Sequence, residues 1–326
     1  MNFWKDKCVF VTGATGLVGS WLVKDLIKKG AKVSALILDY DMNSELIRSG
    51  DIKFINTVDG NLRDYATVFK AIQKHNSQVI FHLGAQTIVG TAINSPKETF
   101  ESNIQGTWNI LETTRKLPNL VESVVVASSD KAYGSSKNLP YVEDHPLKGV
   151  GPYDVSKSCT DLIAQAYGLT YGLPVTISRC GNIYGGGDLN WSRIIPGTIR
   201  SLLNAQQPVL RSNGLYIRDY INVDDVVSAY LLLAEETTSK NLNGQAFNFS
   251  TDIALTVLEL YEAICMEAVG RKVEPKILNE ATSEIKDQHL DSKKAKHILN
   301  WNSKIDLHQG LQSTVKWYKE FLLGAA

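Results

Sequence analysis

The chain has 326 residues, of which 44% are hydrophobic, and its 34 Lys and Arg side chains are balanced by 34 Asp and Glu side chains. This balance excludes the basic footprint of a protein that binds nucleic acid or a membrane surface, and no apolar run is long enough to cross a bilayer. The length suits two domains, or one domain with a substantial cap.

The cysteines and histidines bear on compartment and metal binding. The four cysteines lie far apart with no Cys-x-x-Cys pair, and the histidines are scattered without metal-ligand spacing. This pattern predicts a reducing compartment and no metal site. No signal peptide is visible before the first apolar run, so we expect a cytoplasmic protein.

The first elements in chain order predict a strand, a glycine-rich turn and a helix. Residues 7–11 are a short apolar run, residues 12–19 read TGATGLVG, and residues 20–29 carry apolar side chains at helical spacing. Gly30 is placed to end the helix, and a second apolar run at 32–38 completes a βαβ unit.

The glycines of the first turn follow the pattern Gly-x-x-Gly-x-x-Gly. Glycines allow the backbone to approach a pyrophosphate, and a helix N-terminus adds N–H groups and the positive end of its dipole. We therefore predict a dinucleotide here; the alternative is a glycine-rich turn without a ligand. The expected contacts are Gly13, Thr15, Gly16, Leu17, Val18 and Gly19.

Asp39 follows the second predicted strand, about twenty residues beyond the glycine turn. A carboxylate at this position accepts hydrogen bonds from the adenosine ribose hydroxyls, whereas an arginine would suit the 2′-phosphate of NADP. No arginine lies near this strand end, so the sequence favours NAD. The alternative is an ordinary loop aspartate.

Strands and helices continue to alternate after Asp39. The apolar runs predict strands at 53–55, 78–83, 121–127 and 174–178, and helices at 65–74, 96–117 (one helix or two) and 153–171. This alternation indicates an α/β fold with a Rossmann-type, doubly wound parallel sheet.

The pattern loosens after Arg179. We predict a flexible loop at 181–187 and helices at 195–203, 226–235 and 256–269, the second of which is capped by Asp224 and Asp225. A late strand is expected at 247–249, and the tail, 291–326, is expected to be helical in two pieces around Trp301. No linker separates the halves, so the second lobe is interleaved with the first. We expect a cofactor-binding domain at 1–178 plus 215–250 and a smaller substrate-binding lobe at 179–214 plus 251–326.

Polar side chains follow the strand predicted at 121–127, and the central stretch closes with Tyr153 and Lys157. These two are four residues apart and share one face of a helix. A lysine ammonium beside a tyrosine stabilises the phenolate and lowers its pKa, which gives a candidate acid/base. The alternative is a chance pair on the surface, because Tyr-x-x-x-Lys alone is a weak motif.

Five stretches occur in one order: residues 12–19, HLGAQ at 82–86, SSDKAYG at 128–134, YDVSK at 153–157 and RDYINVDD at 218–225. With them, nearly the whole chain resembles the extended short-chain dehydrogenase/reductase family, the nucleotide-sugar epimerases and dehydratases. The resemblance implies NAD as cofactor, a nucleoside-diphosphate sugar as substrate, and a homodimer formed through the helices that hold Trp108 and Tyr153.

The residues that follow the serine at the end of the central strand differ between the epimerases and the dehydratases of this family. Epimerases usually carry no acid there, and many hexose 4,6-dehydratases carry Thr-Asp-Glu. Here Ser129, Asp130 and Lys131 resemble the CDP-glucose 4,6-dehydratase branch. The same branch is suggested by the stretches FW at 3–4, GNIYGGGD at 181–188 and LDSKKA at 290–295.

The chain departs from its relatives at two positions. Asn61 stands where many have Asp, in the region that reads the adenine, and Ile285 lies near a second diphosphate-binding arginine of the epimerases. The task of holding the diphosphate would then fall more heavily on Arg218 and Arg193. For Arg218 the alternative is a local ion pair with Asp219.

The resemblance also implies catalytic roles. Tyr153 as phenolate takes the proton of the C4 hydroxyl while NAD accepts the C4 hydride, Ser129 hydrogen-bonds the same oxygen, and Lys157 holds the nicotinamide ribose. Asp130, with a raised pKa, protonates the departing C6 hydroxyl. Lys131 acts as the C5 base or positions it; the alternatives are a solvated lysine or a partner of Asp130.

The expected function is dehydration of a nucleoside-diphosphate hexose, CDP-glucose favoured, to a 4-keto-6-deoxy sugar. The rivals are an epimerase or reductase on the same fold and a non-catalytic NAD-sensing protein. Further cofactor contacts are expected at Asn61, Leu62, Leu83, Gly84 and Ala85, and further substrate contacts at Gln86, Asn182, Arg193 and Arg218. His82, inside a strand, is expected to be a core histidine.

Overall fold

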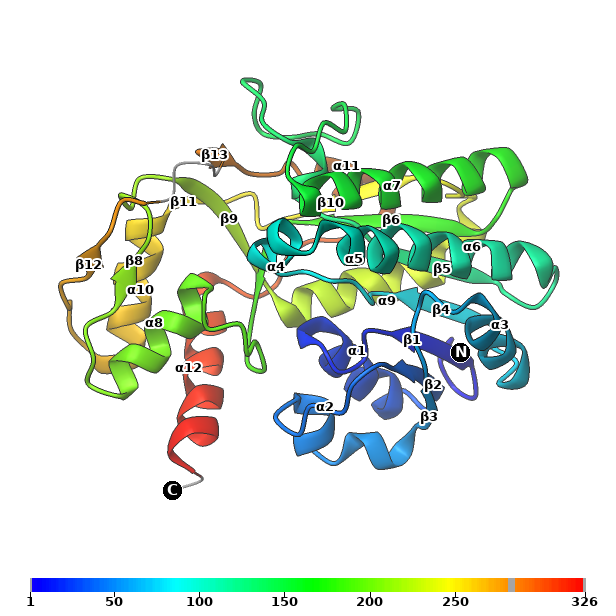
Figure 1. Cartoon of the computed structure of the whole chain (residues 1–326), viewed down its shortest axis with the longest axis horizontal. Helices are drawn as coiled ribbons and strands as arrows, with labels where there is room; N and C mark the ends of the chain where they lie inside the picture. The colour runs from blue at the N-terminus through cyan, green and yellow to red at the C-terminus, as the bar shows by residue number, and fades with distance from the viewer. Residues whose placement is uncertain (1, 281–284, 325–326) are drawn as a thin grey trace.

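The computed structural model describes residues 2–280 and 285–324. Its centre is a seven-stranded sheet in which all neighbouring strands are parallel. The strand order is β10 (Ala246–Phe249), β6 (Val175–Cys180), β5 (Ser123–Ala127), β4 (Val79–His82), β1 (Cys8–Thr12), β2 (Lys32–Ile37) and β3 (Asn56–Asp59) (Figure 1). The chain builds outward from β1 in one direction and from β4 in the other, which confirms the doubly wound α/β fold.

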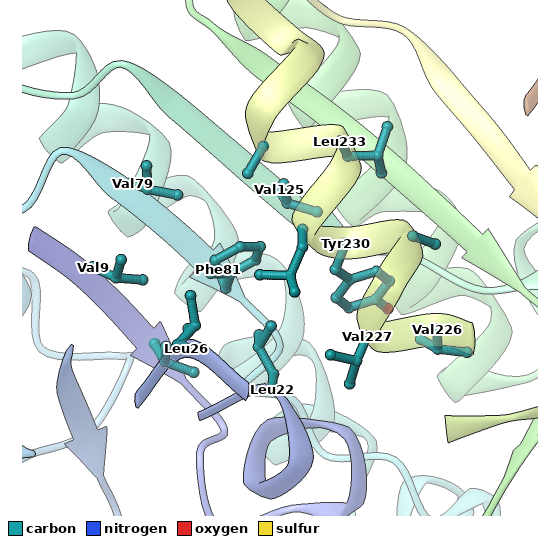
Figure 2. Packing of buried hydrophobic residues seen from close by; sticks show 14 of the residues in the cluster. Val9, Leu22, Leu26, Val79, Phe81, Val125, Val226, Val227, Tyr230 and Leu233 are labelled. Atoms are coloured by element: carbon teal, nitrogen blue, oxygen red, sulfur yellow. The ribbon is translucent and has the colours of Figure 1, made fainter. Parts of the chain in front are cut away.

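Helices cover both faces of the sheet, because successive strand residues point to opposite sides. Phe81 and Val125 belong to one core, and their neighbours Ile80 and Val124 belong to the other. The first core packs against α1 (Leu17–Lys28) and α9 (Val223–Ser239), as Figure 2 shows for Leu22, Leu26, Val227, Tyr230 and Leu233. The second packs against α3 (Tyr65–Lys74), α6 (Gly106–Lys116) and α7 (Pro152–Tyr171).

The helix α7, which carries Tyr153 and Lys157, is fixed at both ends by its sequence. Gly151 is its N-cap, Pro152 occupies the first turn, and Gly172 ends it in the left-handed conformation. Before α6, the chain forms α4 (Val89–Asn94), α5 (Pro96–Phe100) and a π-helical turn (Glu101–Gln105). The region predicted as one helix or two is therefore a helix with a π-helical turn in its middle.

A second lobe with its own hydrophobic core stands beside the sheet (Figure 1). Its helices are α8 (Ile194–Leu203), α10 (Val257–Val269) and α12 (Leu307–Leu323), and its short strands are β7 (Asn182–Tyr184), β8 (Val209–Leu210), β9 (Ile217–Asn222), β11 (Ala254–Thr256), β12 (Lys276–Ile277) and β13 (Asp287–Gln288). Strand β9 pairs with β7, β11 and β13, and β8 pairs with β12. The helix α11 (Lys293–Leu299) returns to the sheet beside β10.

Three local expectations are wrong. Residues 53–55 are no strand, because a 3-10 helix covers Asp51–Phe54 after α2 (Glu45–Arg48) and β3 begins at Asn56. The loop predicted at 181–187 contains the strand β7, which gains its partner from β9. The cap of α9 is Asn222, whose side chain accepts from the Asp224 N–H.

The two helical pieces of the tail are confirmed as α11 and α12. In the part of the chain that the structure describes, no helix is both long and apolar enough to span a bilayer.

Candidate active site

A cleft of about 2230 Å³ lies over the carboxyl ends of the central strands and continues into the second lobe. Ligand pockets commonly measure ~300–1,000 Å³, so this cleft has room for a cofactor and a substrate together. Every predicted site residue lines it: Gly13, Thr15, Gly16, Leu17, Val18, Gly19, Asp39, Asn61, Leu62, Leu83, Gly84, Ala85, Gln86, Ser129, Asp130, Lys131, Tyr153, Lys157, Asn182, Arg193 and Arg218.

The glycine turn forms a cradle without room for side chains. Gly13 has φ of +73°, and a Cβ there would lie 2.8 Å from the Gly84 nitrogen. A Cβ on Gly19 would lie 2.0 Å from the Gly13 oxygen. The helix α1 begins directly after Gly16 with no acidic residue in its first turn, so its free N–H groups suit an anionic pyrophosphate.

The groups expected around the adenosine lie next to this cradle. Asp39 is exposed two residues beyond β2, where its carboxylate suits ribose hydroxyls. The Asn61 Oδ1 accepts from the backbone N–H and the Nε of Arg63 at 3.0 and 3.3 Å, and Arg63 pairs with Glu101 at 3.0 Å. The residues present therefore fit a dinucleotide whose adenosine ribose carries no 2′-phosphate.

His82 is a buried structural histidine, as expected. Its two ring nitrogens lie 3.0 Å from the hydroxyls of Thr12 and Thr107, and burial lowers its pKa to about 3. Thr12 also accepts from the Gly84 N–H at 3.0 Å. This network holds the turn after β4 against the glycine cradle.

Asp130 occupies a 3-10 turn, Asp130–Tyr133, that follows β5. Ser129 caps the turn: its Oγ accepts from the Lys131 N–H at 3.2 Å and donates to Asp130 Oδ1 at 2.9 Å. Burial raises the pKa of Asp130, although the charges of Lys131 and Arg218 oppose the rise. The predicted direction is confirmed, and a raised pKa suits a carboxyl that acts as an acid.

Lys131 lies among polar and acidic side chains. Its Nζ donates to the Gln288 Oε1, and its charge acts to lower the pKa of both Asp130 and Asp154. The electrostatic interaction with Asp130 favours the alternative in which Lys131 is a partner of Asp130. The role as C5 base stays a prediction.

Tyr153 and Lys157 lie one helical turn apart on α7, in the cleft. Burial raises the pKa of Tyr153 to about 12, although Arg193 and a hydrogen bond with Ser129 act to lower it. The expectation that Lys157 brings the pKa of Tyr153 below its usual value is therefore wrong for this structure. Lys157 Nζ donates to the Ala127 carbonyl at 2.7 Å, and burial lowers its own pKa to about 8.

The groups expected to bind substrate are held by the second lobe and by the turn after β4. Arg193 is partly exposed and pairs with Asp188 at 3.0 Å, whereas Arg218 is buried and donates to the carbonyls of Ile285 and Lys286. Asn182 Nδ2 donates to the Asp219 carbonyl at 3.2 Å.

Gln86 lies in a turn that its side chain and its backbone both help to hold in place. Its side-chain amide donates to the Ile88 carbonyl at 3.0 Å, and its backbone N–H donates to Asn103 Oδ1 at 2.7 Å. The side chain lines the cleft, where it is placed to contact a substrate.

Two buried residues near Asp130 were missed by the sequence analysis. Gln288, 157 positions from Lys131, reaches it because β13 pairs with β9. Asp219 lies inside β9, where its Oδ2 accepts from Ser250 Oγ at 2.6 Å and from the Leu290 N–H at 3.1 Å. The sequence analysis considered Asp219 only as an ion-pair partner of Arg218, and no local pattern marks Gln288.

Comparison with known families tests the resemblance. The family model described as GDP-mannose 4,6 dehydratase matches residues 10–314. The chain belongs to this family of nucleotide-sugar 4,6-dehydratases. Membership confirms the resemblance to the extended short-chain dehydrogenase/reductases and the expectation of an enzyme of the 4,6-dehydratase family, whose named members are hydro-lyases.

Individual relatives of this family member include dehydratases and epimerases. The chain is 31% identical to the CDP-glucose 4,6-dehydratase of Salmonella typhimurium, over 99% of this chain and 93% of that protein. The dTDP-glucose 4,6-dehydratase of Streptomyces venezuelae, solved with NAD and TYD bound, superposes with a TM-score of 0.85 at 28% identity, covering 96% of this chain and 97% of that one. The prediction of NAD is thereby confirmed at the level of the family.

An epimerase has a similar fold. The UDP-glucose 4-epimerase of Thermotoga maritima, solved with UDP-glucose, gives a TM-score of 0.87 at 26% identity, covering 96% of this chain and 99% of that one. Because both activities occur on this fold, the site residues must decide between them.

Proposed function

We propose that this 4,6-dehydratase family member removes water from a nucleoside-diphosphate hexose, CDP-glucose favoured, and forms the 4-keto-6-deoxy sugar. Asp130 carries the proposal: it is a buried carboxyl with a raised pKa in the cleft, hydrogen-bonded to Ser129. Elimination needs an acid for the departing hydroxyl, and epimerisation does not. The 31% identity to a CDP-glucose 4,6-dehydratase supports the choice of nucleotide.

NAD, held along the glycine cradle and Asp39, would supply hydride chemistry by accepting hydrogen from C4 and returning it to C6. The chain's own groups then move the protons. Tyr153 takes the proton of the C4 hydroxyl once its own hydroxyl is a phenolate, with Ser129 hydrogen-bonded to it. Lys157 is tied to the Ala127 carbonyl at 2.7 Å, one turn from Tyr153, where it is placed to hold the nicotinamide ribose.

Elimination breaks the C5–H and C6–O bonds. The C5 proton passes to neutral Lys131 or to a group that Lys131 positions, and that group returns a proton to C5 when hydride reaches C6. The Asp130 proton passes to the C6 hydroxyl, which leaves as water. In each turnover Tyr153 gains one proton and Asp130 loses one. Ser129 is hydrogen-bonded to both, so it is placed to return the proton from Tyr153 to Asp130.

The diphosphate is proposed to lie between Arg193 and Arg218, because guanidinium groups suit phosphate oxygens. The Arg218 guanidinium is oriented by the carbonyls of Ile285 and Lys286, which leaves less of its rotamer entropy to be lost on binding. Asn182 and Gln86 line the same cleft and are proposed as further substrate contacts.

The assembly and location of the protein are also proposals. Exposed apolar side chains on α6 and α7, Trp108, Leu162 and Leu169, support a homodimer through these helices. The separate core of the second lobe supports two lobes, proposed at 1–178 plus 215–250 and at 179–214 plus 251–326. Strand β9 departs from this division, because it belongs to 215–250 but pairs with strands of the second lobe. Four free cysteines are compatible with a cytoplasmic location.

Mass spectrometry of the protein incubated with CDP-glucose, GDP-mannose, UDP-glucose and dTDP-glucose tests the function. The proposal expects CDP-glucose to lose one water, and turnover of any of the four sugars would exclude a purely NAD-sensing protein. Loss of water from a different sugar alone would contradict the CDP-glucose assignment. No water loss from any of them would contradict the dehydratase proposal.

The second candidate is a nucleotide-sugar 4-epimerase, favoured by the TM-score of 0.87 to the Thermotoga maritima epimerase. It would use Tyr153 and Lys157 in the same way and leave Asp130 without a chemical role. Unchanged product mass together with an inverted C4 configuration would establish it.

A further inference from the structure

Gln288 is a fully buried side chain that reaches the active site through Lys131. Its Oε1 accepts from the Lys131 Nζ at 2.5 Å, and Lys131 lines the cleft. A lysine ammonium carries only donors, so the amide must present its oxygen to it. The Nε2 of Gln288 is left for another partner, and it has none among the residues that the structure describes.

The strand that carries Gln288 does not itself require an amide at this position. Strand β13 pairs with β9 through backbone groups, with Gln288 opposite Arg218. A buried N–H without an acceptor lowers stability, so an apolar side chain of the same length would suit the fold better. What the amide adds here is an acceptor for Lys131.

This acceptor is neutral. Within residues 2–280 and 285–324, Lys131 forms no salt bridge, although its charge acts on Asp130 and on Asp154 of α7. A carboxylate in hydrogen-bond contact would favour the ammonium form of the lysine, whereas an amide carries no charge. Gln288 therefore orients the amine without an anion that holds its proton.

Other charged and titratable groups face this part of the cleft from each neighbouring element. They are Asp130 of the same turn, Tyr153 and Asp154 of α7, Arg218 of β9, Asp287 of β13, and Tyr141 before α7. Burial raises the pKa of Asp130, Asp154 and both tyrosines, so these groups resist ionisation. A charge introduced at position 288, in direct contact with Lys131, should therefore act on it strongly.

We propose that Gln288 is a positioning residue that acts through Lys131: its neutral amide orients the Lys131 amine for removal of the C5 proton. The inference rests on the proposed dehydration and selects Lys131 itself as the base. The neutral amine takes the C5 proton as the C6–O bond breaks, and the resulting ammonium returns a proton to C5 when hydride reaches C6. Gln288 Oε1 accepts from the nitrogen in both states.

Acetylation of Lys131 tests the contact without any substrate. Neutral amines react with acetic anhydride and ammonium groups do not, and mass spectrometry of the peptides gives the rate at Lys131 relative to the exposed Lys97. We expect Gln288→Glu to slow this reaction by about tenfold or more at neutral pH, because the carboxylate raises the pKa of the lysine. Gln288→Met, which has no carboxylate, should not slow it. Equal rates in wild type and Gln288→Glu would overturn the proposal.

Gln288→Met separates positioning from a structural role. We expect its unfolding temperature to equal or exceed that of wild type, because a buried N–H without an acceptor is removed. Dehydration of CDP-glucose should nevertheless slow by about tenfold, a part of the usual contribution of a base. The isotope effect of deuterium at C5 on product formation should increase, since transfer of the C5 proton becomes the slow step.

The control Gln165→Met removes a half-buried amide that donates to Asp161 outside the cleft, and should leave the rate and the isotope effect unchanged. A lower unfolding temperature of Gln288→Met with an unchanged isotope effect would show a structural role and overturn the proposal. A wild type that dehydrates none of the four sugars would remove the proposed function and this role with it. Equal acetylation in an active enzyme would remove the role of Gln288 alone.

Discussion

At the scale of single residues, the chemistry depends on Asp130 remaining protonated beside two cations. Burial favours the neutral acid, whereas Lys131 and Arg218 favour the anion, and the balance leaves the pKa of Asp130 raised. Tyr153 shows the same dominance of burial, with a pKa of about 12 in spite of Arg193 and Ser129. Any cation that binds beside the Tyr153 hydroxyl would lower that pKa.

The substitution Asp130→Asn should separate oxidation from elimination. The amide cannot protonate a leaving hydroxyl, so we expect dehydration to slow by at least about 100-fold, which is the usual contribution of an acid. Oxidation at C4 uses Tyr153 and should continue, so the absorbance of reduced cofactor should accumulate. Asp130→Glu keeps an acid and should recover part of the rate; equal dehydration by wild type and Asp130→Asn would contradict the assignment.

At the scale of elements, the cofactor cradle depends on two turns lying in contact. Gly13 of the first turn lies so close to Gly84 of the turn after β4 that a Cβ at Gly13 would force them apart. The hydrogen bonds that His82 makes with Thr12 and Thr107, together with the start of α1, hold these two turns in place. Affinity for a dinucleotide should therefore follow the spacing between the turns.

We expect Gly13→Ala to weaken NAD binding by about tenfold or more, which corresponds to ~1.4 kcal/mol. Gly50→Ala is the matched control, because Gly50 also has positive φ, of +79°, but has open space at its Cβ and lies outside the cleft. Titration calorimetry with NAD would measure both. Similar affinities in the two variants would contradict the role of the cradle.

A buried ion pair joins α7 to β6 behind the catalytic turn. Arg179 Nε lies 2.8 Å from Asp161 Oδ2, and Arg179 also donates to Tyr133 Oη at 2.8 Å. Breaking a buried pair leaves an uncompensated charge, so we expect Arg179→Met to lower the free energy of unfolding by about 3–5 kcal/mol.

Urea unfolding tests this prediction, with Lys272→Met, which removes the exposed pair with Glu262, as a control of little effect. The double variant Arg179→Met, Asp161→Leu should recover much of the loss, since no buried charge remains. A small effect of Arg179→Met alone would show that the pair does not support the turn.

Whether a site residue can be predicted from the sequence depends on how far apart in the chain the interacting residues lie. The glycine turn, Asp39, and the residues from Ser129 to Lys157 that were predicted for the site line the cleft, because each is a local pattern at the end of a strand or the start of a helix. Gln288 and Asp219 reach the site through pairing between distant strands, which periodicity does not encode. Residues 53–55 were misassigned because β3 is an edge strand whose residues are mostly exposed, so its apolar pattern is weak.

At the scale of the whole molecule, the sheet carries the cofactor cradle and the second lobe completes the cleft. The two are connected by interleaved segments, as β9 leads directly into α9 and β10 is followed by β11 and α10. In Figure 1 the second lobe stands at the left, and α6 and α7 run along the sheet toward the right; these helices expose Trp108 and Leu162. A dimer through these helices would leave the cleft open.

We expect the wild type to be a dimer by light scattering and the double variant Trp108→Glu, Leu162→Glu to be a monomer, because two buried charges would face each other across the interface. Met266→Glu places a charge on an exposed apolar position of α10 and should leave the dimer intact. A monomeric wild type, or a dimeric double variant, would contradict this assembly.

The most direct test of the account follows one atom through the reaction. CDP-glucose that carries deuterium at C4 is incubated with the enzyme, and the product is examined by mass spectrometry and NMR. We expect loss of one water and deuterium at C6, because hydrogen leaves C4 before the elimination, in which Asp130 is the acid, and returns to C6 after it. A product of unchanged mass that keeps deuterium at C4 and has the inverted C4 configuration would contradict it and establish an epimerase.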